Sequence, residues 1–306
     1  MFEKLVLVTR KTRLQQLIER FNSRAQAKFY IEHAGGDFGD YLHEDEVYSR
    51  SLEALHRGLD LGLKVQQIER AIVPTFLFTE KDLVVAVGQD GLVANVAKYA
   101  GAQPIVAVNP DPERFDGVLL PFQTPQAPGA VTRVLEGKAR FRQVTLAEAR
   151  LGDGQRLLGF NDLFVGARSH VSARYRIGLG ERQEPQSSSG VLVSTGAGST
   201  GWLSSVFNMA AEIASFTGGK AGAPVRLDWE DPRLVFVVRE PFSSRHSQAG
   251  LVAGVLKAGE ALRLESQMPS GGVIFSDGVE SDALAFNSGA IASIGAAAQG
   301  TRLVVG

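Results

Sequence analysis

One stretch, Leu83 to Tyr99, constrains the fold of this chain more than any other. Five apolar residues (Leu83 to Val87) predict a buried strand, GQDG (88–91) predicts a tight turn, and Val93 to Tyr99 continues with helical periodicity. Open α/β sheets bind ligands at the carboxyl ends of their strands. Glycine permits close backbone approach there, and a helix amino terminus favours phosphate. The turn is therefore either a phosphate-binding loop or a plain connection that needs two glycines.

The segments around this stretch continue the alternation of strands and helices. Further strands are predicted at Leu5 to Thr9, Lys64 to Ile68 and Ile105 to Val108. Helices are predicted to begin near Thr12, to cover Ala25 to His33, and to cover Val47 to Leu61 with Gly62 as C-cap. GGDFGDY (35–41) reads as a surface loop, and Pro74 to Phe78 as one helical turn. This order predicts an α/β domain with a mostly parallel sheet.

The pattern changes after about residue 122. QTPQAPGA (123–130) holds two prolines and a glycine, which predicts a hinge between domains. The segments that follow are short and separated by turn residues, as is typical of an all-β sandwich, and one helix, Trp202 to Phe216, interrupts them. We therefore expect an α/β domain over residues 1–122 and a β-rich domain over residues 123–306.

Composition excludes several classes of function. The net charge of −1 gives no sign of a nucleic-acid or membrane partner, and no apolar run is long enough to span a bilayer. The absence of cysteine excludes disulfides, zinc–thiolate sites and cysteine nucleophiles, and it fits a cytoplasmic protein. The five histidines lack the paired spacing of metal ligands, so we expect no metal site built from protein side chains.

A second glycine-rich loop, STGAGSTGW (194–202), matches the dinucleotide pattern G-x-G-x-x-G. The segments around it lack strand–helix–strand alternation. The nearest acid after a following strand, Asp228, also lies well beyond the roughly 20 residues that a Rossmann site requires. A Rossmann site is therefore disfavoured. Two interpretations stay open: a turn that holds a nucleotide at a helix start, and a purely structural loop.

The two loops belong to a series of motifs that occur in the order of the NAD kinase family. The series is GQDG with the strand PIVAVN, then NPDPERFDGVLLPF, GFNDLFVG, SSSGVLVSTGAGSTGW and FSDGVESD. The likeness runs from about Leu5 to Asp282. Within the family the chain resembles the mitochondrial-type branch and its bacterial relatives, through VTRKTR, the long 22–46 segment, NPDPERFDG, SHVSARYRI and SSSGVLVSTGAGS. The order and spacing of the motifs carry the assignment.

This resemblance implies an NAD kinase-like fold, with an active site in the crevice between an amino-terminal α/β domain and a β-rich, NAD-binding carboxyl-terminal domain. The implied reaction moves the γ-phosphate of ATP, carried with Mg²⁺, to the 2′-hydroxyl of the adenosine ribose of NAD and gives NADP. ATP and NAD would then be the ligands. The family also implies a homo-oligomer, a dimer or a tetramer, formed through the exposed faces of the β domain.

The resemblance implies roles for individual residues of this sequence. Asp90 matches the catalytic aspartate, which can orient the ribose hydroxyl and accept its proton. Asn161 and Asp162 match an Asn-Glu pair that holds NAD, with an acid one methylene shorter here. The remaining expected ligand contacts are Gly88 and Gly91 along the phosphates, Asn109 after the next strand, Ser194, Thr195, Ser199 and Thr200 in the second loop, and Asp277.

Charge and turn chemistry add two further expectations. Arg10 and Arg13, with Lys11 between them, precede or open a predicted helix, where cations are unfavourable unless an anion binds. They can clamp the ATP phosphates or form solvated surface charge. Asp277-Gly278 suits a hairpin turn as well as a site position.

Three residues depart from the family motifs. The first loop reads Gly88-Gln89-Asp90-Gly91-Leu92 where the family has Gly-Gly-Asp-Gly-Thr, and Ala197 stands where threonine is common. If position 89 needs a positive φ, Gln89 adds strain of about 1 kcal/mol or more, although its amide can also bond phosphate. Leu92 removes a hydroxyl that can bond phosphate or cap the helix. These changes keep two alternatives open: a catalytically inactive NAD(P)-binding sensor, and a sugar or lipid kinase of the same superfamily.

Overall fold

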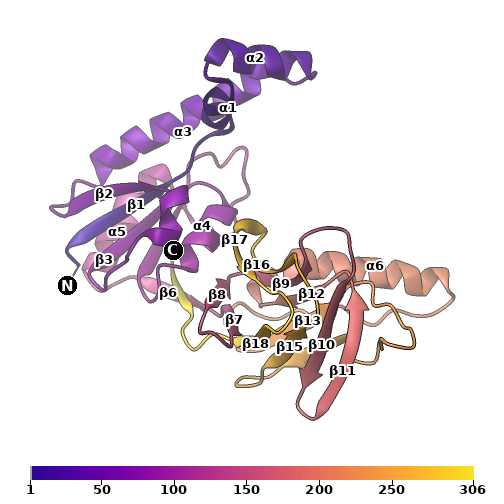
Figure 1. The fold of residues 1–306 in the computed structure, drawn as a ribbon. Helices are drawn as coiled ribbons and strands as arrows, with labels where there is room; N and C mark the ends of the chain where they lie inside the picture. Colours follow the sequence, from indigo (N-terminus) through magenta and orange to yellow (C-terminus); the bar gives the residue numbers. More distant parts are fainter. Residues whose placement is uncertain (1) are drawn as a thin grey trace. The chain divides into compact units, whose positions relative to one another are not determined.

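A mostly parallel sheet lies at the centre of the amino-terminal part of the chain. In the computed structural model, which describes residues 2–306, strands β1 (Lys4–Thr9), β2 (Lys64–Glu69), β3 (Asp82–Val87) and β4 (Pro104–Asn109) pair in parallel in the order β2-β1-β3-β4 (Figure 1). Strand β19 (Thr301–Val305) joins β4 in parallel, β6 (Arg140–Val144) follows it, and β5 (Phe122–Gln123) pairs with the end of β4. The predicted parallel sheet is confirmed.

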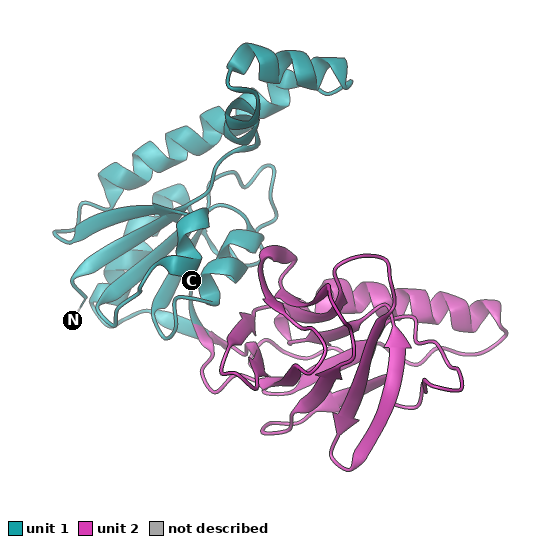
Figure 2. Cartoon of the chain, viewed as in Figure 1, with its two compact units in different colours: residues 1–142, 302–306 teal, residues 143–301 magenta. Residues whose placement is uncertain are grey.

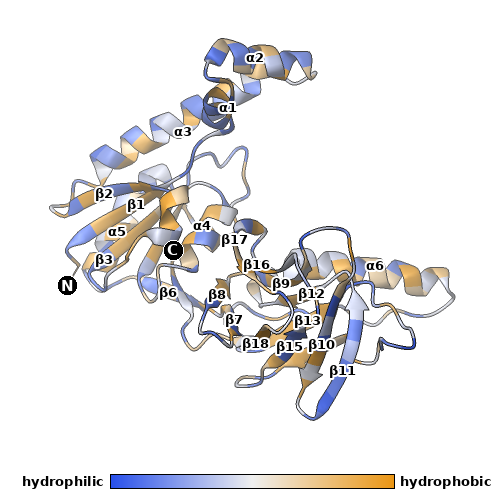
Figure 3. Cartoon of the chain, in the orientation of Figure 1, coloured by the Kyte–Doolittle hydropathy of each residue, from blue (hydrophilic) through white to orange (hydrophobic). Residues whose placement is uncertain are grey.

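Helices connect the strands of this sheet along the chain. They are α1 (Arg13–Phe21), α2 (Arg24–His33), α3 (Phe38–Gly58), α4 (Asp90–Ala97) and α5 (Ala127–Leu135), with short 3₁₀ helices η1 (Arg70–Thr75) and η2 (Thr124–Gln126). Helices α3 and α5 pack against one face through Tyr48, Leu55 and Ala130, and these side chains share a core with Leu5 and Leu7 of β1. The apolar colouring of β1 and β3 in Figure 3 matches strands that are buried on both faces.

Three local predictions in this region are wrong. The segment predicted as a surface loop contains the start of α3, because Asp37 caps the helix through the Gly39 amide (2.7 Å) and Phe38 packs beside Leu14. Helix α3 ends at Gly58 with Leu59 as C-cap, so Gly62, at φ +78°, lies in the turn beyond. The single turn predicted at 74–78 is replaced by η1, which ends at Thr75.

The stretch predicted as a hinge is part of the α/β core. Pro125 and Pro128 lie in the first turns of η2 and α5, where proline needs no amide partner. Ala127 and Ala130 are fully buried against the sheet. The two compact units therefore comprise residues 1–142 with 302–306, and residues 143–301, instead of dividing at residue 122 (Figure 2). The last strand, β19, returns to the first unit.

The second unit is a sandwich of two antiparallel sheets. One sheet has the order β11-β10-β15-β18-β7-β8 and the other β14-β13-β12-β9-β16-β17. Their bounds are β7 (Ala147–Leu151), β8 (Arg156–Gly159), β9 (Asp162–Ala167), β10 (Ala173–Leu179), β11 (Arg182–Ser188), β12 (Val191–Ser194), β13 (Leu234–Val238), β14 (Ala253–Leu256), β15 (Leu262–Ser266), β16 (Gly272–Ser276), β17 (Val279–Ala285) and β18 (Ile291–Ala296). The predicted all-β sandwich is confirmed.

The alternation of side chains along the strands builds two cores in this unit. Val191 and Val193 of β12 point into the core between the sheets, beside Tyr175 of β10. Leu192 points to the opposite face, where helix α6 (Trp202–Phe216) covers the sheet through Leu203. Helix α6 has the bounds that the sequence predicts. No helix within residues 2–306 is long and apolar enough to cross a membrane.

Candidate active site

The GQDG turn connects β3 to α4 at the carboxyl edge of the parallel sheet. Gly88 donates its amide to Val108 O of β4 (3.2 Å), and Gln89 is the N-cap of α4. Gln89 has φ −109° and ψ 166°, an extended conformation that any residue adopts. Gln89 therefore has none of the backbone strain that a positive φ would cause at this position. Gly91 is exposed, and a Cβ there would meet no atom within 4 Å, so the turn presents an open backbone surface.

Asp90 is the first residue of α4, and one of its carboxylate oxygens is held in place. Oδ1 accepts a hydrogen bond from the Leu119 amide (2.8 Å). Within residues 2–306, Oδ2 has no hydrogen-bond partner, and the side chain is half-buried. A carboxylate with one fixed and one free oxygen can accept a proton from a hydroxyl without losing its orientation.

Asn109 positions the segment that carries Leu119. Its Nδ2 donates to Phe115 O (2.8 Å), and its Oδ1 accepts from the Asp111 amide (3.0 Å). The segment packs so closely that a Cβ on Gly117, which has φ +63°, would lie 2.6 Å from Asn109 Nδ2. The Asn109 amide is thus engaged by its own loop, and it acts on Asp90 through Leu119.

Leu92 faces the interior of the unit. It is 2% exposed, and its Cδ2 lies 3.0 Å from the position of a Cβ on Gly88. The leucine therefore fills space beneath the turn. Glycine at position 88 leaves room for it and for the Arg10 side chain, whose Cδ would lie 3.4 Å from the same Cβ position.

Arg10 and Arg13 share one buried carboxylate. Arg10 Nη1 donates to Glu44 Oε1 (2.9 Å), and Arg13 Nε donates to Glu44 Oε2 (2.5 Å). Burial alone would raise the pKa of Glu44, but the hydrogen bonds from Arg13 and Arg10 outweigh it and hold the pKa below its ordinary value. Both cations are therefore compensated by one buried carboxylate, and the Arg13 side chain stays 43% exposed, whereas that of Arg10 is 11% exposed. Lys11, in contrast, pairs at the surface with Glu19 and Glu69.

Tyr48 ties the same network to the strand that carries the turn. Its hydroxyl donates to Val87 O (3.0 Å) and accepts the Arg10 amide (2.9 Å), so it joins the ends of β1 and β3. Burial raises the pKa of Tyr48 to about 12. Glu44 and Tyr48 lie four residues apart on α3, one turn of helix. Neither residue is predicted as part of the site from the sequence, because the predicted helix begins at Val47 and no local pattern links it to the turn.

In the second unit, Asp277 fixes the backbone at the start of β9. Its Oδ2 accepts from the Phe160 amide (3.0 Å) and its Oδ1 from the Asn161 amide (2.6 Å). Asp277 and Gly278 have φ of +53° and +69° and form the two-residue turn between β16 and β17. The predicted Asp-Gly hairpin is confirmed, and the same aspartate positions the predicted Asn-Asp pair.

The second glycine-rich loop is held by its own hydroxyls. Thr195 Oγ1 donates to Phe160 O (2.6 Å), Ser194 Oγ donates to Thr195 O (3.2 Å), and Ser199 Oγ accepts from the Leu227 amide (3.2 Å). All three side chains are buried, whereas Ala197 is half-buried and Thr200 is exposed. The buried hydroxyls of this loop therefore hold its backbone, and Thr200 is left exposed and accessible to a ligand.

Close backbone packing explains two of the glycines in this loop. A Cβ on Gly196 would overlap the Asp228 carbonyl, and a Cβ on Gly198 would overlap the Asn161 carbonyl. Both glycines are required by the fold of the sandwich. The strands around the loop pair in antiparallel fashion, as expected if this loop is not a Rossmann site.

Asp162 has an unusual environment. It is the first residue of β9, opposite Ser194, and it is 6% exposed. Burial, together with the charge of Asp277, raises the pKa of Asp162 to about 7. Asn161, next to it, is half-buried. A raised carboxyl pKa beside a half-open amide is a feature of ligand sites.

A cavity of about 170 Å³ with an aromatic lining, which includes Phe164, Trp202 and Phe275, lies in the second unit and was not predicted. Phe164 of β9 stacks on Trp202 of α6 (5.5 Å between ring centroids) and also contacts Phe275. The Arg239 guanidinium lies over the Trp202 ring, 5.3 Å from its centroid. Trp202 follows the glycine-rich loop directly, so its place after that loop was the signal that could have found it.

Within residues 2–306 no group of three or more histidine, aspartate or glutamate side chains is placed to hold a metal ion. The protein therefore supplies no ready-made cage for a cation.

Comparison with known proteins gives matches in both sequence and structure. NAD kinase 2, mitochondrial, is 24% identical in Rattus norvegicus and 23% identical in Homo sapiens. Each match covers 79% of this chain, and 74% and 71% of the relative. No protein-family model matches the chain.

Two solved structures share the fold. Yeast NADH kinase complexed with NADH has a TM-score of 0.58 at 17% identity, over 100% of this chain and 84% of that one. An NAD kinase from Archaeoglobus fulgidus in complex with ATP has a TM-score of 0.55 at 16% identity, over 98% and 92%.

The sequence and the fold comparisons agree on one class of similar proteins, the NAD kinases. The chain is similar in sequence to NAD kinase 2, mitochondrial, and its fold is NAD kinase-like. The curated relatives are named as mitochondrial proteins, so the cytoplasmic location expected from the composition stays a prediction.

Proposed function

We propose that this protein transfers the γ-phosphate of MgATP to the 2′-hydroxyl of the adenosine ribose of NAD and releases NADP and ADP. The observation that carries the proposal is the Asp90 carboxylate, with one oxygen fixed by Leu119 and the other free, at the start of a helix that opens from a glycine turn. This arrangement combines a proton acceptor with a backbone surface suited to phosphate.

The proposed step needs one proton acceptor and in-line positioning. The ribose hydroxyl oxygen forms a bond to the γ-phosphorus, and the bond from that phosphorus to the bridging β–γ oxygen breaks. The hydroxyl proton moves to Asp90 Oδ2, while Oδ1 stays bonded to the Leu119 amide. ADP leaves with the electron pair of the broken bond.

Phosphate binding is assigned to the GQDG turn. Gly91 leaves the backbone open, and the extended conformation of Gln89 allows its amide side chain to donate to a phosphate oxygen without strain. Arg10 lies beside Gly88, fixed by Glu44, so its charge contributes to the turn from a preorganised position. Magnesium belongs to the substrate in this proposal, carried on the ATP phosphates.

NAD recognition is assigned to the second unit. Asn161 and Asp162 are the proposed ribose and base contacts, held in position by Asp277. A protonated Asp162 can donate a hydrogen bond as well as accept one, which its raised pKa permits near neutral pH. Thr200 supplies an exposed hydroxyl, and Trp202 an aromatic face.

The rival function is a catalytically inactive NAD(P) sensor, motivated by Gln89, Leu92 and Ala197. The relaxed backbone at Gln89 and the interior position of Leu92 favour turnover over this rival, because neither residue blocks the open side of the turn. Incubation of the purified protein with MgATP and NAD, with NADP detected by an NADP-specific dehydrogenase, tests the choice. Wild type and Gln89→Gly should both form NADP. Saturable NAD binding without any turnover in wild type would establish the sensor instead.

A substrate panel tests the second alternative. Sugars, diacylglycerol and sphingoid bases offered with MgATP should give no phosphorylated product at the enzyme concentration that converts NAD. Phosphorylation of one of these compounds with no reaction of NAD would show a sugar or lipid kinase. The proposed homo-oligomer is tested separately by sedimentation velocity, where a single dimer or tetramer species is expected.

A further inference from the structure

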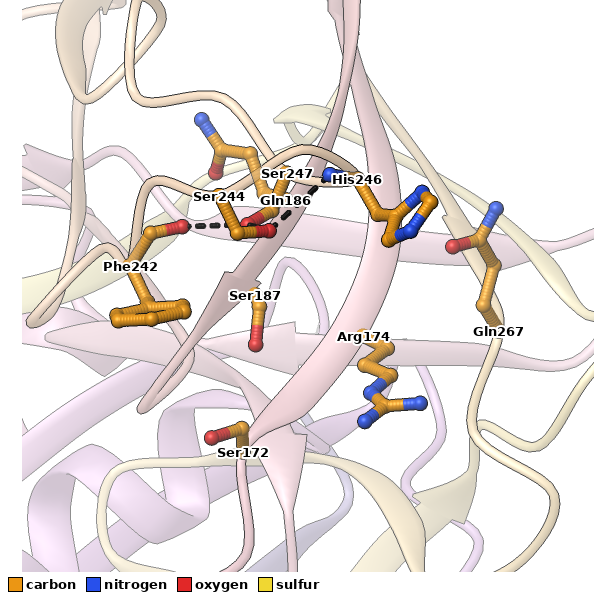
Figure 4. A pocket seen from close by; sticks show the side chains of 9 residues that line it. All are labelled: Ser172, Arg174, Gln186, Ser187, Phe242, Ser244, His246, Ser247 and Gln267. Carbon is orange, nitrogen blue, oxygen red and sulfur yellow. Dashed lines mark hydrogen bonds between the residues drawn. The ribbon is translucent and has the colours of Figure 1, made fainter.

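A polar cavity of about 460 Å³ lies in the second unit, and it contains none of the residues assigned above to ATP or NAD. It is lined by Ser172, Arg174, Gln186, Ser187, Phe242, Ser244, His246, Ser247 and Gln267 (Figure 4). Strands β10 and β11 form its base, the 240–250 loop its upper wall and the segment after β15 its far side. Its volume is in the range of small-ligand pockets.

The lining is rich in hydrogen-bond donors and has no carboxylate. Arg174 supplies a guanidinium, and within residues 2–306 it forms no ion pair. His246 supplies an imidazole, Ser172 and Ser187 supply hydroxyls, and Gln267 supplies an amide. In Figure 4 these side chains surround a common open space. Such a set of donors, with one guanidinium able to form two parallel bonds, matches a phosphate group.

The 240–250 loop is held by its own hydrogen bonds, which fix the side of the cavity that carries His246. Ser247 Oγ donates to Phe242 O (2.7 Å), so the Ser244 hydroxyl donates to Ser247 Oγ (2.8 Å). Ser244 Oγ in turn accepts the His246 amide (3.1 Å). These bonds use both hydroxyls, and they leave the imidazole of His246 to face the cavity.

A buried polar network joins this loop to the sheet. Glu184 Oε1 accepts the amides of Gly250 (2.9 Å) and Leu251 (2.8 Å) and the Gln186 side chain (2.6 Å). The Tyr175 hydroxyl donates to Gln186 Oε1 (3.1 Å), and it forms a second hydrogen bond with Ser188 Oγ (2.6 Å). The Glu184 charge is therefore satisfied internally, and it holds the pocket wall in place instead of repelling an anion. A pocket fixed in this way binds its ligand with little ordering cost.

Phe242 gives the pocket one apolar wall. Its ring is 64% exposed, although its backbone is fixed by the bond from its amide to Ser187 O (2.8 Å). A flat apolar ring beside a cluster of phosphate donors suits a ligand that carries a planar base as well as a phosphate.

We propose that this pocket is a second nucleotide site, which binds the phosphomonoester of a nucleoside monophosphate through Arg174 and His246 and its base on Phe242. The site is separate in sequence from the GQDG turn and from the Asn161–Asp162 pair. It does not depend on the function proposed for them, and occupation of the pocket need involve no chemical step.

Calorimetric titration of the full-length chain with AMP tests the proposal, with adenosine and inorganic phosphate as partial probes. AMP should bind at least tenfold more tightly than either partial probe. Arg174→Ala should weaken AMP binding at least tenfold, and His246→Ala several-fold. Arg263→Ala, which removes an exposed arginine from β15 of the same sheet outside the pocket, should leave the affinity within twofold.

Two outcomes would overturn the assignment. If AMP binds equally well to wild type and to Arg174→Ala, AMP binds outside this pocket, for example at the proposed kinase site. If AMP binds no better than adenosine, the phosphate donors of the pocket play no part. Asp90→Asn provides the complementary control, because AMP affinity for this pocket should survive the loss of the proposed proton acceptor.

Discussion

The Leu119 amide donates a hydrogen bond of 2.8 Å to Oδ1 of Asp90. This bond ties the first residue of α4 to the loop after β4, which Asn109 shapes from within. One oxygen of the carboxylate is thereby fixed and the other is left for a substrate. The same unit supplies a second fixed network, in which Glu44 and Tyr48 of α3 hold the ends of β1 and β3.

Glu44→Gln should lower the free energy of unfolding by about 2 kcal/mol. Removing one partner of a fully buried ion pair costs about 3–5 kcal/mol, and the effect is smaller here because Arg13 is 43% exposed. Urea denaturation measures the change. Glu19→Gln, which removes an exposed carboxylate that pairs with Lys11, is the matched control. It should change the free energy of unfolding by less than about 0.5 kcal/mol, because exposed ion pairs contribute little to stability. Equal effects of the two substitutions would contradict a stabilising role for the bonds from Arg10 and Arg13 to the buried Glu44.

Asp277→Ala should destabilise the second unit and weaken NAD binding more than ATP binding. It removes the acceptor of the Phe160 and Asn161 amides, worth about 1.5 kcal/mol each, and puts alanine at φ +53°. Asp277→Asn keeps one acceptor and tolerates this conformation, so it should restore much of the loss. The ratio of KM for NAD to KM for ATP is the decisive measurement. A parallel rise in both constants would argue against a specific effect on Asn161.

Leu92→Thr, which restores the family residue, should lower stability by about 2 kcal/mol without raising kcat. The leucine is buried, so threonine leaves a cavity and an interior hydroxyl. Leu92→Met, of similar volume, should be tolerated within about 1 kcal/mol. Thermal unfolding and steady-state kinetics of the three proteins give the comparison. A gain in kcat without loss of stability would mean that position 92 faces the nucleotide after all.

Asp162 should make stability depend on pH between about 4 and 7. Its folded-state pKa of about 7 exceeds the unfolded value of 3.8, so the folded protein holds the proton more tightly. The contribution of the group is fully present below pH 3.8 and is lost as pH rises through 7. A rise in pKa from 3.8 to about 7 corresponds to a loss of about 4 kcal/mol in the free energy of unfolding.

Asp162→Asn should remove this dependence, since it keeps the size of the side chain and cannot ionise. Urea unfolding of both proteins at pH 5 and pH 8 measures it, and the variant should gain stability relative to wild type at the higher pH. An unchanged difference between the two proteins across this range would show that Asp162 titrates normally in the folded chain.

Much of the architecture follows from sequence pattern alone. The buried strand at 83–87, the helix at 202–216 and the change to short strands each carry a strong local signal, and all three are present in the structure. The hinge prediction failed because proline and glycine also open helices, and whether Ala127 and Ala130 meet a core depends on tertiary contacts. The return of β19 to the first sheet is likewise a long-range pairing without a local signal.

Motif order predicts Asp90, Asn161, Asp162 and the second loop as site residues. It did not reveal that Asn109, Thr195 and Asp277 use their polar groups to hold backbone segments. Glu44 was missed because its partners lie more than 30 residues away in sequence, at separations of 34 and 31. Hydrogen bonds over such distances are set by the fold and leave no periodic pattern.

The most direct test of the proposed function compares NADP formation by wild type, Asp90→Asn and Asp116→Asn under saturating MgATP and NAD. Asp116 is exposed in the loop between Asn109 and Leu119, so its variant controls for the loss of a nearby charge. Wild type and Asp116→Asn should form NADP at similar rates, and Asp90→Asn should be slower by a factor of about 10² to 10⁴. NADP formation by Asp90→Asn at the wild-type rate would contradict the assignment of Asp90 as the proton acceptor.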